Sequence, residues 1–157
     1  MLGIKNFFKK WRSRKCIKRR REVIQRARIR IQRESDVCFG RYGKLQTQSA
    51  KCRVTLNAID RHKETVIAEL EKPNPNPKKI IAAEVMLTEA LADFEGLLAN
   101  WQKFYKSATK HWADRIPDKQ KFREDVEFQI QTFRKLITLT KSDLGWIRSV
   151  KHDLGLK

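Results

Sequence analysis

The sequence is short of the residues that interrupt helices. Its 157 residues include six glycines and four prolines, and three of those prolines fall within residues 73–77. The remaining chain can therefore form long helices without internal breaks. With 40% hydrophobic and 34% charged residues, the chain has enough apolar side chains for a core, which argues against disorder over its whole length. We expect an ordered, all-α protein.

The sequence also lacks the features of a secreted or membrane-spanning protein. Its three cysteines, Cys16, Cys38 and Cys52, form no Cys-x-x-Cys pair and do not make a secreted disulfide framework. No run approaches 18 apolar residues, and no apolar segment of a signal peptide is present. We expect no transmembrane span and no secretion. The expected location is intracellular, cytoplasmic or nucleoid-associated, or inside a virus particle.

Catalytic and metal-binding patterns are missing as well. None of the three histidines belongs to a Glu-x-x-His or His-Glu-x-x-His motif. Gly40 to Lys44 has the wrong spacing for a phosphate-binding loop, and no hydroxyl residue follows the lysine. The carboxylates of Glu89, Asp93 and Glu95 are close in sequence, but they fit a solvated acidic helix face better than an acid–base pair. We expect no catalytic residue, no metal site and no cofactor, and therefore no enzyme.

Acidic residues are scarce, and the basic excess is concentrated at one end. The chain has 36 lysines and arginines against 18 aspartates and glutamates, a net charge of +18. Residues 1–35 contain 14 basic and 2 acidic side chains, so they carry +12 of that +18. A charge of one sign packed this densely is typical of a segment that binds a polyanion.

Hydrophobic spacing predicts where the helices lie. Apolar residues recur every seven residues from residue 17, which indicates a long helix with one packing face. The positions are Ile17, Ile24, Ile31, Cys38, Leu45, Cys52, Ile59 and Val66. Gly40 and Gly43 favour a kink or short break in this helix that leaves the spacing intact. The prolines of residues 73–77 predict a turn, and apolar residues at spacings of three and four predict two further helices after it.

These patterns predict a three- to four-helix bundle or antiparallel helical hairpin with a long basic N-terminal helical arm. The arm covers residues 1–35. The bundle covers residues 36–157, with helices at about 44–71, 78–113 and 119–154. Asp118 follows Pro117 and is predicted to cap the last helix.

The arm contains two amphipathic segments. In the first, an apolar wedge at spacings of three and four residues fills one arc of a helix. Its members are Ile4, Phe7, Phe8 and Trp11. In the second, an arginine-rich face lies opposite a row of isoleucines. The cations predicted to contact a polyanion are Lys5, Lys9, Lys10, Arg12, Arg14, Lys18, Arg19, Arg21, Arg26, Arg28, Arg30 and Arg33.

Three functions are compatible with this arm. The first is binding of DNA or RNA, mostly through the phosphate backbone, as a structural or accessory subunit of a nucleoprotein assembly. The second is peripheral binding to an anionic membrane, because an unbroken helix from residue 3 to 33 points the wedge and the arginine face in the same direction. The third is a protein-only helical scaffold. We expect nucleic acid as the partner, and a homo-oligomer or a subunit of a larger complex.

Overall fold

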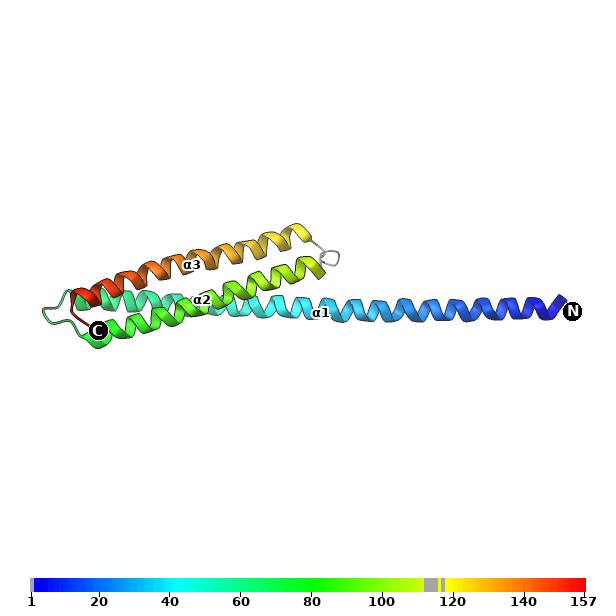
Figure 1. Ribbon diagram of the computed structural model, residues 1–157, viewed down its shortest axis with the longest axis horizontal. Coiled ribbons are helices and arrows are strands. Elements are labelled where there is room, and N and C mark those ends of the chain that lie inside the picture. The colour runs from blue at the N-terminus through cyan, green and yellow to red at the C-terminus, as the bar shows by residue number, and fades with distance from the viewer. Residues whose placement is uncertain (1, 112–115, 117) are drawn as a thin grey trace. The chain divides into compact units, whose positions relative to one another are not determined.

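The fold is all-α, as the sequence predicted. A computed structural model describes residues 2–111, 116 and 118–157; the side chains of residues 2–18, 20, 27–39 and 111 are outside the description. Within these residues there are three helices and no strand: α1 (Leu2–Leu70), α2 (Pro77–His111) and α3 (Lys119–Asp153) (Figure 1). The chain divides into two compact units, residues 1–40 and 41–157, five residues beyond the predicted boundary.

The glycines at positions 40 and 43 do not interrupt α1. Both lie inside the helix, which is continuous from Leu2 to Leu70, so a break at these glycines is wrong. The predicted kink stays a prediction. A methyl group added to either glycine would meet nothing within 4 Å. Neither glycine is therefore required there by a close contact with another side chain.

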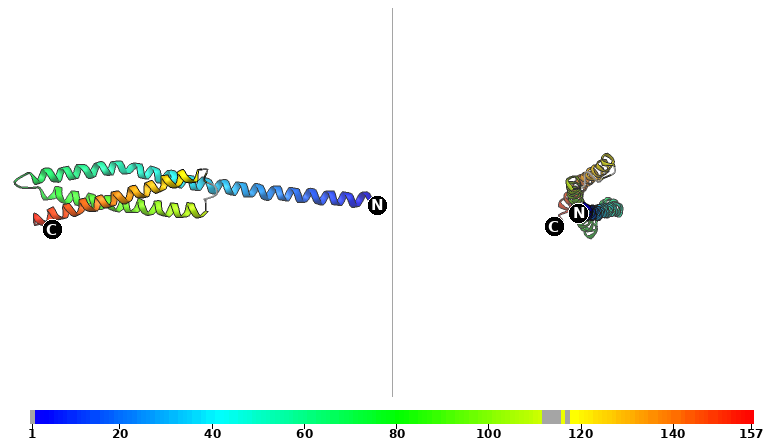
Figure 2. Two further views of the ribbon diagram at one scale, coloured as in Figure 1. Left: turned by 90° about the horizontal axis from the view of Figure 1, so that it is seen from above. Right: turned by 90° about the vertical axis from the view of Figure 1, so that its right-hand side faces the viewer.

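In the unit of residues 41–157, α2 runs antiparallel to the last part of α1, and α3 runs antiparallel to α2 (Figure 2). The backbones of α2 and α3 approach each other most closely. Ion pairs link all three helices: Lys63 of α1 with Asp143 of α3 at 2.9 Å, and Glu95 of α2 with Lys141 of α3 at 3.0 Å.

The heptad positions of α1 in this unit form its packing face. Leu45, Cys52, Ile59 and Val66 are all buried. They face the predicted stripes of α2 and α3, whose largest fully buried members are Trp101, Phe94, Phe133, Ile80, Leu87 and Ile147. The spacing of seven therefore identified the core side of α1 correctly from residue 45 onward.

The large apolar side chains of α3 do not all lie on its buried face. Val150 is buried, but Phe128, Leu139 and Trp146 are 68%, 62% and 36% exposed. They lie 11 and 7 residues apart, which is close to whole numbers of turns, so they share one face of the helix. That face is opposite the buried stripe, and within the described residues no element covers it.

Local signals fix the ends of the helices. The Asp118 carboxylate accepts a hydrogen bond from the Lys121 amide at 3.0 Å, which confirms it as the N-cap of α3. Asn76 caps α2 in the same way, because its Oδ1 accepts a hydrogen bond from the Lys78 amide. Pro77 takes the first helical position. At the end of α3, Gly155 has φ of 64°, and its amide and that of Leu156 bond back to His152 and Lys151. This is the Schellman arrangement.

A buried carboxylate, not predicted from the sequence, holds the turn between α1 and α2. Glu69 is 2% exposed, and its Oε1 accepts hydrogen bonds from Lys72 Nζ at 2.7 Å and Lys79 Nζ at 2.8 Å. Its Oε2 accepts one from the Asn76 amide at 3.0 Å. These donors lower the pKa of Glu69 to about 2, with the Lys72 bond the largest cause. The proline-rich turn is therefore tied to α1 by one ionised side chain.

We expect Glu69→Gln to destabilise the fold because it removes the charge that two lysines surround. At pH 7 the thermal midpoint should fall by about 5–10 °C. In the wild type, the folded pKa lies below the unfolded value, so this contribution is present above about pH 4.5 and is lost as pH falls towards 2. Thermal melts from pH 2 to 7 should show this acid-dependent loss in the wild type and a smaller one in the variant.

The matched control is Glu71→Gln, which removes the same charge from an exposed position two residues away. It should leave the midpoint within about 2 °C of the wild type, as surface changes usually do. Equal effects of the two substitutions would show that the Glu69 contacts do not hold the turn.

Candidate polyanion-binding surface

The predicted polyanion-binding cations all lie in the first half of α1. Residues 5–33 are inside the continuous helix, so their backbone has the conformation assumed in the prediction. The described side chains among them, Arg19, Arg21 and Arg26, are exposed and make no described ion pair. The side chains of the other predicted cations, and of the wedge residues Ile4, Phe7, Phe8 and Trp11, are outside the description. These site residues remain predictions.

The isoleucine row behind the arginines is not covered in the part that can be described. Ile24, which the spacing placed on a packing face, is 53% exposed, and the neighbouring Val23 is 65% exposed. Burial needs a neighbouring element, so the seven-residue spacing alone does not produce it. Ile24 and Val23 are thus exposed and available for a partner.

A second group of cations lies in the unit of residues 41–157 and was not singled out in the sequence. Arg41 and Lys44 of α1 and Lys103 of α2 border a cavity of about 370 Å³ between the two helices. Leu45 and Phe104, which are 8% and 7% exposed, contribute apolar surface to it. All three cations are exposed. Because Lys103 is about 60 residues from the others in sequence, only the packing of α1 on α2 brings them together.

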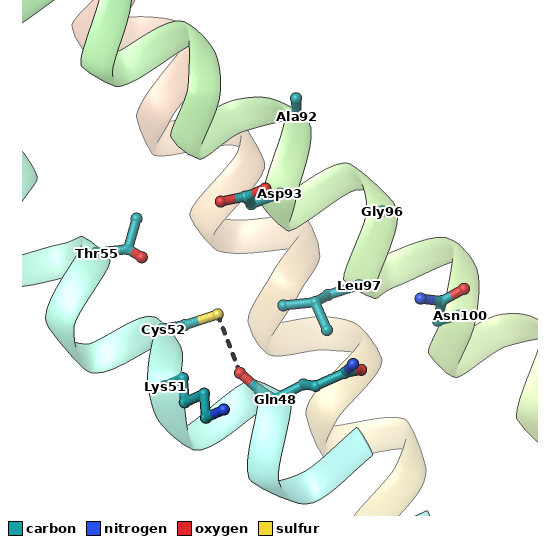
Figure 3. A pocket seen from close by; sticks show the side chains of 9 residues that line it. All are labelled: Gln48, Lys51, Cys52, Thr55, Ala92, Asp93, Gly96, Leu97 and Asn100. Carbon is teal, nitrogen blue, oxygen red and sulfur yellow. Dashed lines mark hydrogen bonds between the residues drawn. The ribbon is translucent and has the colours of Figure 1, made fainter. Parts of the chain in front are cut away.

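A second cavity, of about 360 Å³, lies further along the same two helices (Figure 3). Gln48 and Asn100 border both cavities. We call the two together the α1–α2 groove. Its walls carry Lys51 on α1 and Asp93 on α2, and Gly96 leaves one wall open because a methyl group there would meet nothing within 4 Å.

Cys52 lies in this groove but is not an activated thiol. Burial, and secondarily the Asp93 carboxylate, raise the pKa of Cys52 above its ordinary value. Its Sγ donates a hydrogen bond to the Gln48 carbonyl oxygen at 3.6 Å. A raised pKa disfavours the nucleophilic thiolate, so the residue acts as a small apolar core side chain, as the sequence suggested.

An aromatic cluster borders the groove at the Arg41 end. Tyr42 of α1 contacts Trp101 and Phe104 of α2, each with ring centroids 5.9 Å apart, and Phe122 of α3 at 5.7 Å. Desolvation, followed by the Asp125 carboxylate, raises the pKa of Tyr42. The Trp101 indole also donates a hydrogen bond to Ser49 Oγ at 2.9 Å. These contacts fix α1 against α2 beside the cations.

Among the described residues, no group of three or more histidine, cysteine, aspartate or glutamate side chains is arranged to hold a metal ion. Within the same residues, no helix combines the length and the apolar character needed to cross a membrane. Comparison with known proteins gave no match to a protein-family model, to a curated protein or to a solved structure.

Proposed function

We propose that this chain is a non-enzymatic protein that binds nucleic acid through the phosphate backbone, with the arginine-rich helix of residues 5–33 as its main contact. The observation that carries the proposal is the +12 charge of residues 1–35 on one continuous helix. An arginine-rich helix laid along a nucleic acid neutralises phosphates and releases counterions. Arginine suits this role because its guanidinium group makes two parallel hydrogen bonds to a phosphate.

The proposal includes the architecture that the sequence suggested: a basic helical arm and a helical bundle. In this interpretation the bundle mediates assembly, as a homo-oligomer or as a subunit of a nucleoprotein complex. The exposed row of Phe128, Leu139 and Trp146 on α3 supports this role, because large apolar side chains on one exposed face are typical of a contact with another protein.

A specific observation keeps a second function under consideration, which is binding to an anionic membrane surface. The wedge of residues 4–11 and the arginine face point in the same direction only if the helix is unbroken between residues 3 and 33. Helix α1 is unbroken there. A helix with aromatic residues and cations on one side suits the interface of a lipid bilayer.

Parallel binding measurements test the proposal. The full chain is titrated with duplex DNA, with RNA, and with vesicles of anionic or neutral lipid, each at two salt concentrations. We expect tight binding to nucleic acid that weakens with salt. Phe7→Glu and Trp11→Glu should each reduce that binding by less than about tenfold, because the arginines supply most of the attraction.

The control is Val85→Glu, which introduces the same charge at an exposed apolar position of α2. Strong vesicle binding that disappears in the wedge variants but not in Val85→Glu, together with weak nucleic-acid binding, would replace the first function with the membrane function. Binding to neither ligand by the intact, folded chain would rule out both and leave the protein scaffold.

A further inference from the structure

We propose that the α1–α2 groove is a second nucleic-acid site, which holds a short single-stranded segment. This inference rests on the proposed function and names a contact of a different kind from the arm. Two cavities that share Gln48 and Asn100 follow the same pair of helices, so they form one elongated groove. From Arg41 to Thr55 it extends over about 21 Å, at about 1.5 Å per residue of helix.

The charge on the groove favours an anionic occupant. Arg41, Lys44, Lys51 and Lys103 line it, against the single carboxylate of Asp93. Elsewhere in the unit, lysines that approach a neighbouring helix have acidic partners: Lys63 pairs with Asp143, Lys141 with Glu95 and Lys151 with Glu84. Within the described residues, the four groove cations have no such partner. Their charge is therefore available to a ligand.

The uncharged part of the lining distinguishes a nucleotide strand from a simple anion. Leu45 and Phe104 supply an apolar surface at the cationic end. The side-chain amides of Gln48 and Asn100 lie in the middle, where they can donate and accept hydrogen bonds. A strand offers phosphates to the cations, apolar base faces to the floor and polar base edges to the amides. A second copy of this chain is a poor occupant, because its own charge is +18.

The groove also has room for the strand. Ala92, Asp93 and Gly96 on the α2 wall are exposed, and a side chain added at Gly96 would extend into open space (Figure 3). Each cavity has a volume of about 360–370 Å³, which is the scale of a small-molecule pocket and not of a duplex. We therefore expect the groove to select single strands, whereas the arm accepts either form.

The test uses the full chain and a fluorescently labelled six-residue oligothymidylate. Lys44→Glu combined with Lys103→Glu should weaken binding at least about tenfold. It should reduce the slope of log K against log salt by at least about 1.4, because two contacts at about 0.7 each are lost and two repulsive charges are added. The matched control is Arg134→Glu combined with Lys135→Glu, which makes the same charge change on exposed positions of α3. The control should bind within about threefold of the wild type. Circular dichroism and thermal melts verify that each variant is folded.

A second variant fills the groove without changing the charge. Gly96→Phe places a ring in the open wall. It should weaken binding of the oligothymidylate at least about fivefold while leaving duplex binding by the arm unchanged. If Gly96→Phe does not fold, the Lys44/Lys103 double variant still tests the groove. Both of its lysines are exposed, so their substitution leaves the core intact. Equal binding by the groove pair and the α3 pair would overturn the inference.

Two further outcomes separate this inference from the proposed function. With Arg19, Arg21 and Arg26 all changed to glutamate, duplex binding should fall. In that background, the Lys44/Lys103 substitutions should still weaken oligothymidylate binding more than the Arg134/Lys135 control does. Loss of that difference would place the oligothymidylate on the arm and overturn the groove site alone. Displacement by hexaglutamate at equal charge concentration would also overturn it, because the groove would then recognise charge and not a strand. Failure of every nucleic acid to bind would overturn the proposed function itself.

Discussion

Replacing Trp101 with alanine should lower the free energy of unfolding of the unit of residues 41–157 by about 3–5 kcal/mol. Trp101 is fully buried, so truncation removes a large apolar side chain and leaves a cavity. It also packs edge-on against Tyr42 and Phe104, with interplanar angles of 82° and 85°. For 117 residues, this loss corresponds to a fall in the thermal midpoint of about 12–20 °C.

The effect should be concentrated on the contact between α1 and α2. The backbones of α2 and α3 approach closely along their length, whereas α1 depends on large side chains such as Trp101 to reach its neighbours. We therefore expect amide hydrogen exchange to accelerate more in residues 41–59 than in α3. Urea titration followed by circular dichroism gives the overall loss, and exchange measured by mass spectrometry gives its distribution.

Ser49→Ala is the graded control for Trp101→Ala. It removes the 2.9 Å hydrogen bond from the indole and leaves the tryptophan in place, at an expected cost of about 1 kcal/mol. If Trp101→Ala costs no more than Ser49→Ala, the packing described for the indole ring does not contribute to stability. If exchange accelerates equally in α1 and α3, the residue stabilises the whole unit and not the α1–α2 contact.

The parts of the fold that the sequence predicted are those governed by repeating local rules. A seven-residue spacing keeps Leu45, Cys52, Ile59 and Val66 on one side of a helix, and all four are buried. The cap at Asp118 follows from a single residue type placed before a helix. Such signals need no knowledge of which helix lies next to which.

The features that the sequence missed depend on the packing between helices. Phe128 and Leu139 are as apolar as the buried residues of α3, but the helices beside α3 cover only the opposite face. Glu69 meets Lys79, ten residues away, only because the proline-rich turn reverses the chain. No spacing rule within one helix gives either result.

The candidate site divides in the same way. The cations of residues 5–33 are visible in the sequence because they lie close together along a single helix. The groove cations were overlooked because Arg41 and Lys103 come from different helices and meet only through the register of α1 on α2. Gln48 and Asn100 are ordinary polar residues in the sequence, and only their shared position between the two cavities distinguishes them.

Raising the salt concentration from 50 to 200 mM should weaken duplex DNA binding by the full chain by about 10³–10⁵-fold, if six to ten cations of residues 5–33 contact phosphates. The reason is that each contact releases condensed counterions, and the slope of log K against log salt is about −0.9 for each phosphate on duplex DNA. Arg19, Arg21 and Arg26 are exposed on α1 and free of described acidic partners, which leaves them available for such contacts.

Changing these three arginines to glutamine should therefore reduce the slope by about 2.7, the sum of three contacts at about 0.9 each. Glutamine removes the charge without adding repulsion, so the change in slope counts contacts directly. The matched control changes Arg53, Arg61 and Arg134 to glutamine; these arginines are exposed in the unit of residues 41–157, and the loss of net charge is the same. Fluorescence anisotropy of a labelled duplex at five or more salt concentrations gives both slopes.

Equal slopes for the two triple variants would mean that binding follows net charge alone, and the arm would lose its role as the main contact. A wild-type slope shallower than about −2 would contradict the phosphate-backbone mechanism altogether, because so few released counterions cannot account for a segment of charge +12 lying along a duplex.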